Sequence, residues 1–138
     1  MDYLFVDTSA WVAVVNNRDQ YHPIAGDFYR HCFNNYARLI TSNLVVAETY
    51  IMLRLDCTST VALKWWEMIT DSIKIEVVYP DAGLTADAFD LIRKFKDQRI
   101  SLIDAISFKI MEERLIKEAF TFDSHFSTAG FIQLPVEK

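Results

Sequence analysis

The chain has 138 residues, of which 51% are hydrophobic and 24% are charged. This composition predicts one globular domain over residues 1–138 and excludes a disordered or low-complexity protein. The net charge of −5 argues against general binding of nucleic acid through bulk charge, although it permits a local basic patch. No secretory signal or membrane-spanning segment is visible, and Cys32 and Cys57 lack metal-ligand spacing, so a cytoplasmic protein is expected.

Short apolar strands alternate with amphipathic helices along the chain. The first strand, Tyr3–Val6, is apolar throughout, which is typical of a strand buried on both faces of a parallel sheet. Further strands are expected at residues 38–41, 73–79, 119–122 and 131–134. Helices are expected at residues 8–15, 23–36, 44–55, 59–69 and 84–95, and from residue 101 onward. This alternation predicts an α/β fold with a central, mostly parallel sheet and helices on both faces.

Two aspartates directly follow predicted strands. Asp7 comes after Val6, and Asp123 comes after Phe122. A helix cap would explain either aspartate on its own, because aspartate caps helices often. The carboxyl ends of parallel strands, however, meet at one edge of a sheet, where open α/β sheets bind their ligands. We therefore expect both carboxylates at that edge.

Two further acids lie on helices that are expected to begin at the same edge. Glu48 interrupts an apolar segment, so much of its helix is expected to be buried, and its carboxylate needs a salt bridge or a metal. Asp104 stands three residues after Ser101, a spacing that also suits a helix cap. Four converging carboxylates repel one another unless a hard divalent cation is present. Mg²⁺ or Mn²⁺ fits, because both ions prefer carboxylate and water ligands.

The four acids lie in residues 6–11, 42–49, 101–105 and 121–126, and these segments resemble the signature segments of the PIN-domain ribonucleases. Within that family the chain is most similar to the VapC-like toxins of prokaryotic type II toxin–antitoxin pairs. The resemblance covers nearly the whole chain and implies one PIN-like domain. It implies a catalytic, metal-binding quartet that consists of Asp7, Glu48, Asp104 and Asp123. Ser9 and Thr121 are similar to the accessory hydroxyls that hydrogen-bond this site.

The resemblance further implies a Mg²⁺- or Mn²⁺-dependent ribonuclease that hydrolyses RNA phosphodiester bonds, forms a homodimer and binds a small antitoxin. Arg93 and Arg99 are expected to hold the RNA backbone, because cations near Asp104 would offset its charge. The three histidines lack metal-ligand spacing and are weaker candidates for the site. Trp65 and Trp66 cannot readily point inward together, and an exposed aromatic patch would suit a docking partner.

Other functions would require a different set of residues or would fit the same set. A catalytically silent PIN-like module that binds RNA or protein would be expected to lack one of the acids, whereas all four are present. A PIN nuclease of RNA processing without an antitoxin fits the same residues. A haloacid-dehalogenase-like enzyme would need a second aspartate two residues after Asp7, where Ser9 stands. A receiver domain would need an acid pair before the strand-end aspartate and a downstream strand-end lysine, which we do not find.

Overall fold

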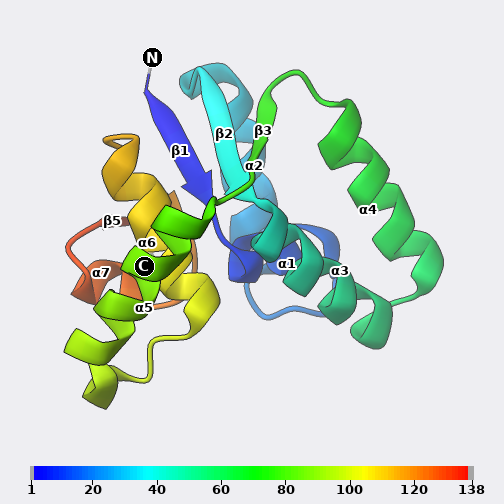
Figure 1. Cartoon of the computed structure of the whole chain (residues 1–138). Helices are drawn as coiled ribbons and strands as arrows, with labels where there is room; N and C mark the ends of the chain where they lie inside the picture. The colour runs from blue at the N-terminus through cyan, green and yellow to red at the C-terminus, as the bar shows by residue number, and fades with distance from the viewer. Residues whose placement is uncertain (1, 137–138) are drawn as a thin grey trace.

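The structure is a computed structural model that describes residues 2–136, and a five-stranded sheet forms its centre (Figure 1). The strands are β1 (Tyr3–Val6), β2 (Arg38–Ser42), β3 (Ile75–Val78), β4 (Glu118–Phe120) and β5 (Ile132–Leu134). Their spatial order is β3-β2-β1-β4-β5, and all four pairings are parallel. The predicted α/β fold is confirmed, and among the described residues the sheet is wholly rather than mostly parallel.

Seven α-helices occur in residues 2–136, in two groups. The helices are α1 (Thr8–Val15), α2 (His22–Asn35), α3 (Asn43–Asp56), α4 (Ser59–Asp71), α5 (Ala82–Lys94), α6 (Leu102–Glu113) and α7 (His125–Thr128). Helix α1 contacts α2 and α3, and α3 contacts α4, whereas α6 contacts α5 and α7. Figure 1 shows α3 and α4 on one side of the strands and α5 and α6 on the other. None of these helices is long and apolar enough to cross a membrane.

Strand β1 is the centre of the sheet and the point where its topology switches. Leu4, Phe5 and Val6 are fully buried, as the apolar run predicts. From β1 the chain passes to β2 and β3 on one side, and then returns to β4 and β5 on the other. Open parallel sheets form a crevice at such a switch point, outside the carboxyl ends of the two strands. Here those strands are β1 and β4, the ones that precede Asp7 and Asp123.

Local signals set several element boundaries. Ser42 and Ser101 cap α3 and α6, because their side chains accept hydrogen bonds from Val45 N and Asp104 N. Strand β3 is shorter than the predicted 73–79, since its pairing with β2 ends at Ser42 opposite Val78.

The prediction that much of the helix carrying Glu48 is buried is wrong. Helix α3 buries only Val45, Thr49 and Leu53, a single stripe with a spacing of four residues. That stripe suffices because, among the described helices, α3 packs mainly on α1 and α4. Ile51 and Leu55 are consequently exposed.

The two adjacent tryptophans of α4 have opposite environments. Trp65 is buried and packs edge-on against Trp11, with ring centroids 5.8 Å apart. Trp66 is 46% exposed. Consecutive residues on a helix point in different directions, so only one of the two rings reaches the core. The prediction that they do not both point inward is confirmed.

Candidate active site

Asp7 is buried at the end of β1, with 4% of its surface exposed. It precedes α1, but its carboxylate accepts no capping hydrogen bond from that helix. Instead, its Oδ2 accepts hydrogen bonds from Ser9 Oγ at 3.1 Å and from Thr121 Oγ1 at 2.9 Å. Burial raises the pKa of Asp7 to about 6, although the two hydroxyls oppose the rise. The carboxylate is therefore held by the site rather than used as a helix cap.

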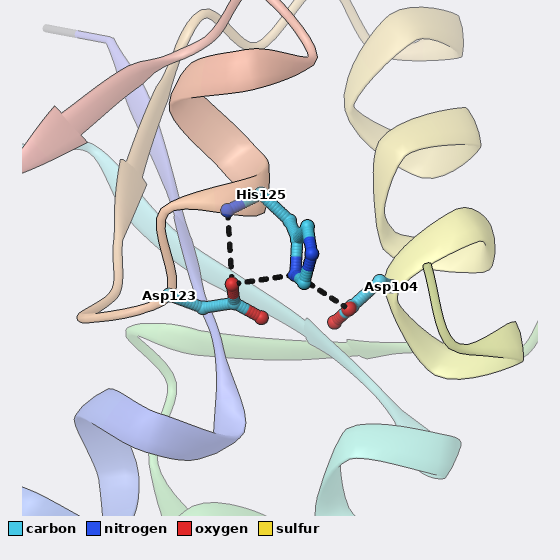
Figure 2. Close-up of side chains that lie close together, drawn as sticks. All are labelled: Asp104, Asp123 and His125. Atoms are coloured by element: carbon cyan, nitrogen blue, oxygen red, sulfur yellow. Dashed lines mark hydrogen bonds and ion pairs between the residues drawn. The ribbon is translucent and has the colours of Figure 1, made fainter. Parts of the chain in front are cut away.

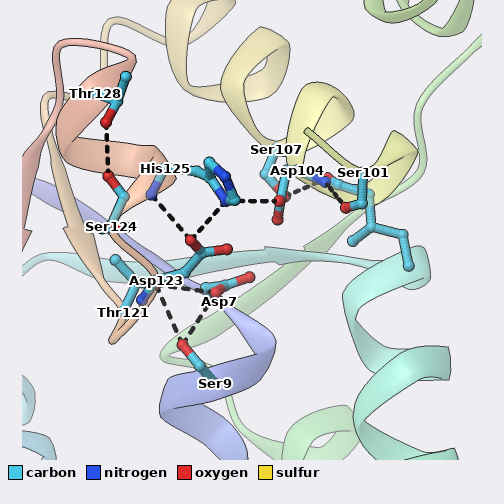
Figure 3. Close-up of polar contacts among 11 residues, drawn as sticks. Asp7, Ser9, Ser101, Asp104, Ser107, Thr121, Asp123, Ser124, His125 and Thr128 are labelled. Atoms are coloured by element: carbon cyan, nitrogen blue, oxygen red, sulfur yellow. Dashed lines mark hydrogen bonds and ion pairs between the residues drawn. The ribbon is translucent and has the colours of Figure 1, made fainter. Parts of the chain in front are cut away.

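The hydroxyls of Ser9 and Thr121 join the first turn of α1 to the loop after β4 (Figure 3). Ser9 Oγ accepts from Phe122 N at 2.9 Å, and Thr121 Oγ1 accepts from Asp123 N at 3.0 Å. Each hydroxyl has one proton. When both protons go to Asp7, the 3.2 Å contact between the two hydroxyl oxygens is not a hydrogen bond. This network holds the two strand-end aspartates at a defined separation.

Asp104 lies in the first turn of α6, and its side chain is 14% exposed. Burial is the largest cause that raises the pKa of Asp104 to about 7, followed by the negative charges of Asp123 and Asp7. Asp123 likewise adds to the raised pKa of Asp7. The three aspartates are thus close enough to repel one another when ionised.

The four predicted acids line one pocket of about 250 Å³. Asp7 and Asp123 come from the carboxyl edge of the sheet, while Glu48 comes from α3 and Asp104 from α6. The pocket is completed by Thr8, Ser9, Met52 and Ser101. The four acids therefore come together in the structure, as expected from the sequence. Their catalytic and metal-binding roles stay a prediction.

His125 also joins this cluster, at the first residue of α7 (Figure 2). Its Nδ1 lies 2.9 Å from Asp123 Oδ1 and 3.8 Å from Asp104 Oδ2. Neither contact is aligned as a hydrogen bond, so Nδ1 is a buried nitrogen without a hydrogen-bond partner. The backbone N–H of His125, in contrast, donates to Asp123 Oδ1 at 2.9 Å. The imidazole therefore lies between the two carboxylates, with Nδ1 nearer to Asp123 than to Asp104.

The donor set suits a hard divalent cation. One carboxylate oxygen from Asp104, one from Asp123 and a ring nitrogen of His125 all lie within 4.8 Å of one another. Asp7 and Glu48 line the same pocket outside this tight group. Carboxylates whose pKa values are raised by burial and mutual repulsion gain most from a bound cation, because the cation offsets both effects. The residues present thus fit Mg²⁺ or Mn²⁺.

The two predicted RNA-binding arginines lie outside the acid pocket. Arg93 is in the last turn of α5, where its Nη1 is 2.6 Å from Asp90 Oδ1 in an exposed ion pair. Arg99 is exposed and follows the 3₁₀ helix η1 (Lys96–Gln98), with a left-handed φ of 51°. Its neighbours Gln98 and Ile100 line a second cavity that also contains His125. Their role in RNA binding stays a prediction.

Sequence reasoning undervalued His125 and missed Thr8. His125 lacks a histidine or cysteine partner in sequence, and the useful signal was its position two residues after Asp123 at a helix start. Thr8 lines the acid pocket, and its Oγ1 is buried without a hydrogen-bond partner. A threonine between an aspartate and a serine resembles any helix start, so no sequence signal distinguished it.

Comparison with known proteins identifies the family. The PIN domain model matches residues 4–132. The 23S rRNA-specific endonuclease VapC20 of Mycobacterium tuberculosis, in strains CDC 1551 and H37Rv, is 32% identical over 134 residues, which cover 97% of this chain and 99% of VapC20. The crystal structure of M. tuberculosis VapC20, a toxin that cleaves the sarcin–ricin loop, superimposes with a TM-score of 0.86 at 31% identity. The superposition covers 94% of this chain and 96% of the VapC20 chain. The predicted family is confirmed: this chain belongs to the PIN-domain family and is a VapC-like member of it.

Proposed function

We propose that this protein is a divalent-metal-dependent endoribonuclease of the cytoplasm and the toxin of a toxin–antitoxin pair, with residues 1–138 as its single domain. The observation that carries the proposal is the pocket lined by four acids at the switch point of the parallel sheet. The similarity to VapC20 over nearly the full length of both chains supports a ribonuclease rather than another use of such a pocket.

The acids have distinct parts in this proposal. Asp104 and Asp123 hold the cation, Mg²⁺ or Mn²⁺, and Asp7 completes the site from the buried side, where Ser9 and Thr121 orient its carboxylate. Glu48 reaches the pocket from α3, as a fourth ligand of the cation or as the group that orients the attacking water. When bound, the cation supplies Lewis-acid chemistry for hydrolysis of a phosphodiester. Carboxylates and water are the ligands that such ions prefer.

The proposed substrate is a single-stranded or looped RNA. VapC20 is an endonuclease specific for 23S rRNA and cleaves the sarcin–ricin loop. Loops present unpaired bases and a bent backbone, which a shallow protein pocket can reach more easily than a regular RNA helix. Arg93 and Arg99 hold the backbone in this proposal. Arg99 stands between Gln98 and Ile100, which line the cavity that also contains His125.

The proposed protein partners are a small antitoxin and a second copy of the chain. An apolar groove of about 610 Å³ lies between α3 and α4, with Val46, Tyr50 and Ile51 on one helix and Leu63 and Trp66 on the other. Its size and exposed aromatic ring suit an apolar segment of the antitoxin. The homodimer is tested by measuring the molar mass in solution over a wide range of concentration.

The function is tested with an RNA hairpin that carries the sarcin–ricin loop sequence. The protein should cleave this RNA with Mg²⁺ or Mn²⁺ and lose the activity with a chelator. Asp104→Asn should reduce the cleavage rate by more than the roughly 10–100-fold that residues around metal ligands typically cost. Asp87→Asn, at an exposed position on α5, is the matched control and should cleave normally. Cleavage that persists in the chelator or in Asp104→Asn would overturn the proposal.

A further inference from the structure

A second, apolar cavity adjoins the acid pocket and has no part in the proposed metal chemistry. It has a volume of about 160 Å³ and lies among α5, α6 and α7. Its apolar walls are Leu91, Ile100, Phe108 and Phe131. His125 lines this cavity too, while its Nδ1 contacts Asp123 and Asp104. The imidazole is therefore the shared boundary between the cavity and the acids.

Helix α6 aligns the two sites along one face. Asp104, Phe108 and Glu112 are spaced four residues apart, which places them on the same side of the helix. Each step of four residues advances roughly 6 Å along the axis. A candidate metal ligand, an aromatic wall and an exposed carboxylate thus follow one another within the reach of a single nucleotide. Figure 3 shows Asp104 and His125 facing each other at the acid end of this row.

The rim of the cavity carries hydrogen-bonding groups. Gln98 and Glu112 are exposed lining residues from two different elements, the first from η1 and the second from α6. Glu112 offers acceptors only, and its Oε2 lies 3.4 Å from Lys109 Nζ in an ion pair that an incoming amino group has to share. The amide of Gln98 offers both a donor pair and an acceptor. Thr128 and Ala129 form the remaining exposed rim. An apolar slot with polar groups at its mouth suits a flat heteroaromatic ring with polar edges.

The segment that contains the lining residue Gln98 is rich in positive charge, in a chain whose net charge is −5. Four cations lie within seven residues next to Gln98: Arg93, Lys94, Lys96 and Arg99. Arg93 pairs with Asp90, and Lys94 Nζ lies 5.5 Å from the centre of the Phe95 ring. In residues 2–136 the other cations of this group make no ion pair. The positive charges of Lys96 and Arg99 therefore remain available for a polyanion. A polyanion that carries flat heteroaromatic rings is a nucleic acid, so we take the ligand to be a nucleotide of RNA.

We propose that this cavity binds one unstacked nucleobase next to the scissile phosphate and prefers bases with an exocyclic amino group, namely adenine, cytosine or guanine, over uracil. The proposal rests on the proposed ribonuclease function and adds a specificity site to it. Phe131, which is partly exposed, provides apolar contact with the ring, as aromatic side chains do for unpaired RNA bases. Phe108 is buried against Phe126 and Phe131 and forms the floor of the cavity. Glu112 accepts a hydrogen bond from the amino group. Uracil has no amino group, and the two carbonyl oxygens that flank its N3–H are repelled by the carboxylate.

The test measures binding of the four nucleoside 5′-monophosphates to the full chain in the presence of Mg²⁺. Amide chemical shifts report both affinity and place, through the signals of Gln98 and Thr128. AMP, CMP and GMP should each bind about tenfold more tightly than UMP, the scale of one good base contact. Ala129→Trp, which fills the mouth from an exposed position, should remove the difference among the four nucleotides.

A matched pair of variants separates base reading from charge. Glu112→Met removes the acceptor and should make the four affinities nearly equal. Glu113→Met makes the same change one residue away, at an exposed position outside the cavity, and should keep the tenfold preference. Unfolding temperatures of all variants confirm that each one is folded.

The outcomes distinguish this proposal from the proposed function. Equal affinities in the unmodified protein, absence of measurable binding, or shifts confined to residues away from the cavity would overturn the base site. If the protein still cleaves RNA, the ribonuclease function stands without it. Preferred binding of the amino-bearing nucleotides without any RNA cleavage would support the base site and overturn the ribonuclease.

Discussion

The two ends of the sheet both carry acidic residues, but they differ in the lysines and arginines that line the cavities beside those acids. At the amino edge, a cavity of about 640 Å³ is lined by Asp2 and Glu118 together with Arg114 and Lys117. At the carboxyl edge, the smaller pocket of about 250 Å³ is lined by four acids and, among residues 2–136, by no lysine or arginine. The larger cavity is thus electrostatically balanced, whereas the smaller pocket is not.

This difference explains which end is suited to chemistry. At the amino end, Arg114 Nη1 pairs with Glu76 Oε2 at 2.7 Å, a neutralised contact on the protein surface. At the carboxyl end, burial and repulsion raise the pKa values of Asp7 and Asp104. Uncompensated charge that persists in a folded protein costs stability, and it is retained where it binds a ligand. Charge imbalance, rather than cavity size, identifies the site.

The largest expected effect on stability is a pH dependence that originates in the acid pocket. The pKa of Asp7 is about 6 and that of Asp104 about 7 in the folded state, against 3.8 without these surroundings. Folding therefore favours their protonated forms. The resulting stabilisation is complete below about pH 4 and is lost as the pH rises through 6 and 7. Asp7 alone contributes roughly 3 kcal/mol to this loss.

Asp7→Asn should remove that contribution from metal-free protein. Urea unfolding from pH 4 to pH 8 should show the variant gaining stability relative to the unmodified protein as the pH rises, because no buried carboxylate has to ionise. Asp2→Asn, at the balanced edge, is the control and should follow the unmodified protein. If the free energy of unfolding changed with pH equally in Asp7→Asn and the unmodified protein, ionisation of Asp7 would not be the source of the pH dependence.

Divalent cations should stabilise the folded protein through the same pocket. A ligand at a hundred times its Kd adds about 2.7 kcal/mol to the free energy of unfolding. Mn²⁺ or Mg²⁺ should therefore raise the unfolding temperature of the unmodified protein at pH 8. The rise should vanish in Asp123→Asn and persist in Asp2→Asn. An equal rise in both variants would show that the ions bind elsewhere.

Removal of the hydroxyls that orient Asp7 should have a smaller effect. Ser9→Ala and Thr121→Val each delete one donor to Asp7 Oδ2. Loss of such a partner typically lowers metal affinity or activity by about 10–100-fold. Thr70→Val is the control, since Thr70 donates only to backbone carbonyls of its own exposed helix turn. RNA cleavage rates and Mn²⁺ titrations measure the change, and unaltered values in both site variants would remove these hydroxyls from the mechanism.

The smallest effect is expected for the arginines outside the pocket. Arg93→Ala combined with Arg99→Ala, in an Asp104→Asn background that prevents cleavage, should weaken RNA binding. The slope of log affinity against log salt should fall by about 1.4 for two lost phosphate contacts to a single strand. Arg30→Ala with Arg38→Ala removes the same charge, and Arg30 has a similar exposed pair with Asp27. A salt slope that changes equally in both double variants would show that only net charge matters.

Much of the fold could be predicted because its signals are local. The apolar run of Tyr3–Val6 and the serines at positions 42 and 101 have the same meaning in any parallel α/β protein. The predicted ends of β3 were inaccurate, because the length of its partner strand β2 decides where the pairing stops. The exposure of Ile51 and Leu55 was missed because an apolar helix pattern does not reveal how many neighbours surround the helix.

By itself, the sequence determined the order of strands and helices, the positions of Asp7 and Asp123 after two of the strands, and the family to which the chain belongs. Only the tertiary structure decided that Asp7 serves the site rather than a helix cap, and that His125 lies between Asp104 and Asp123. The physical reason is that helix and strand signals act over a few residues. Contacts across the switch point join residues more than a hundred positions apart, and the parallel pairing of β1 with β4 sets their distance.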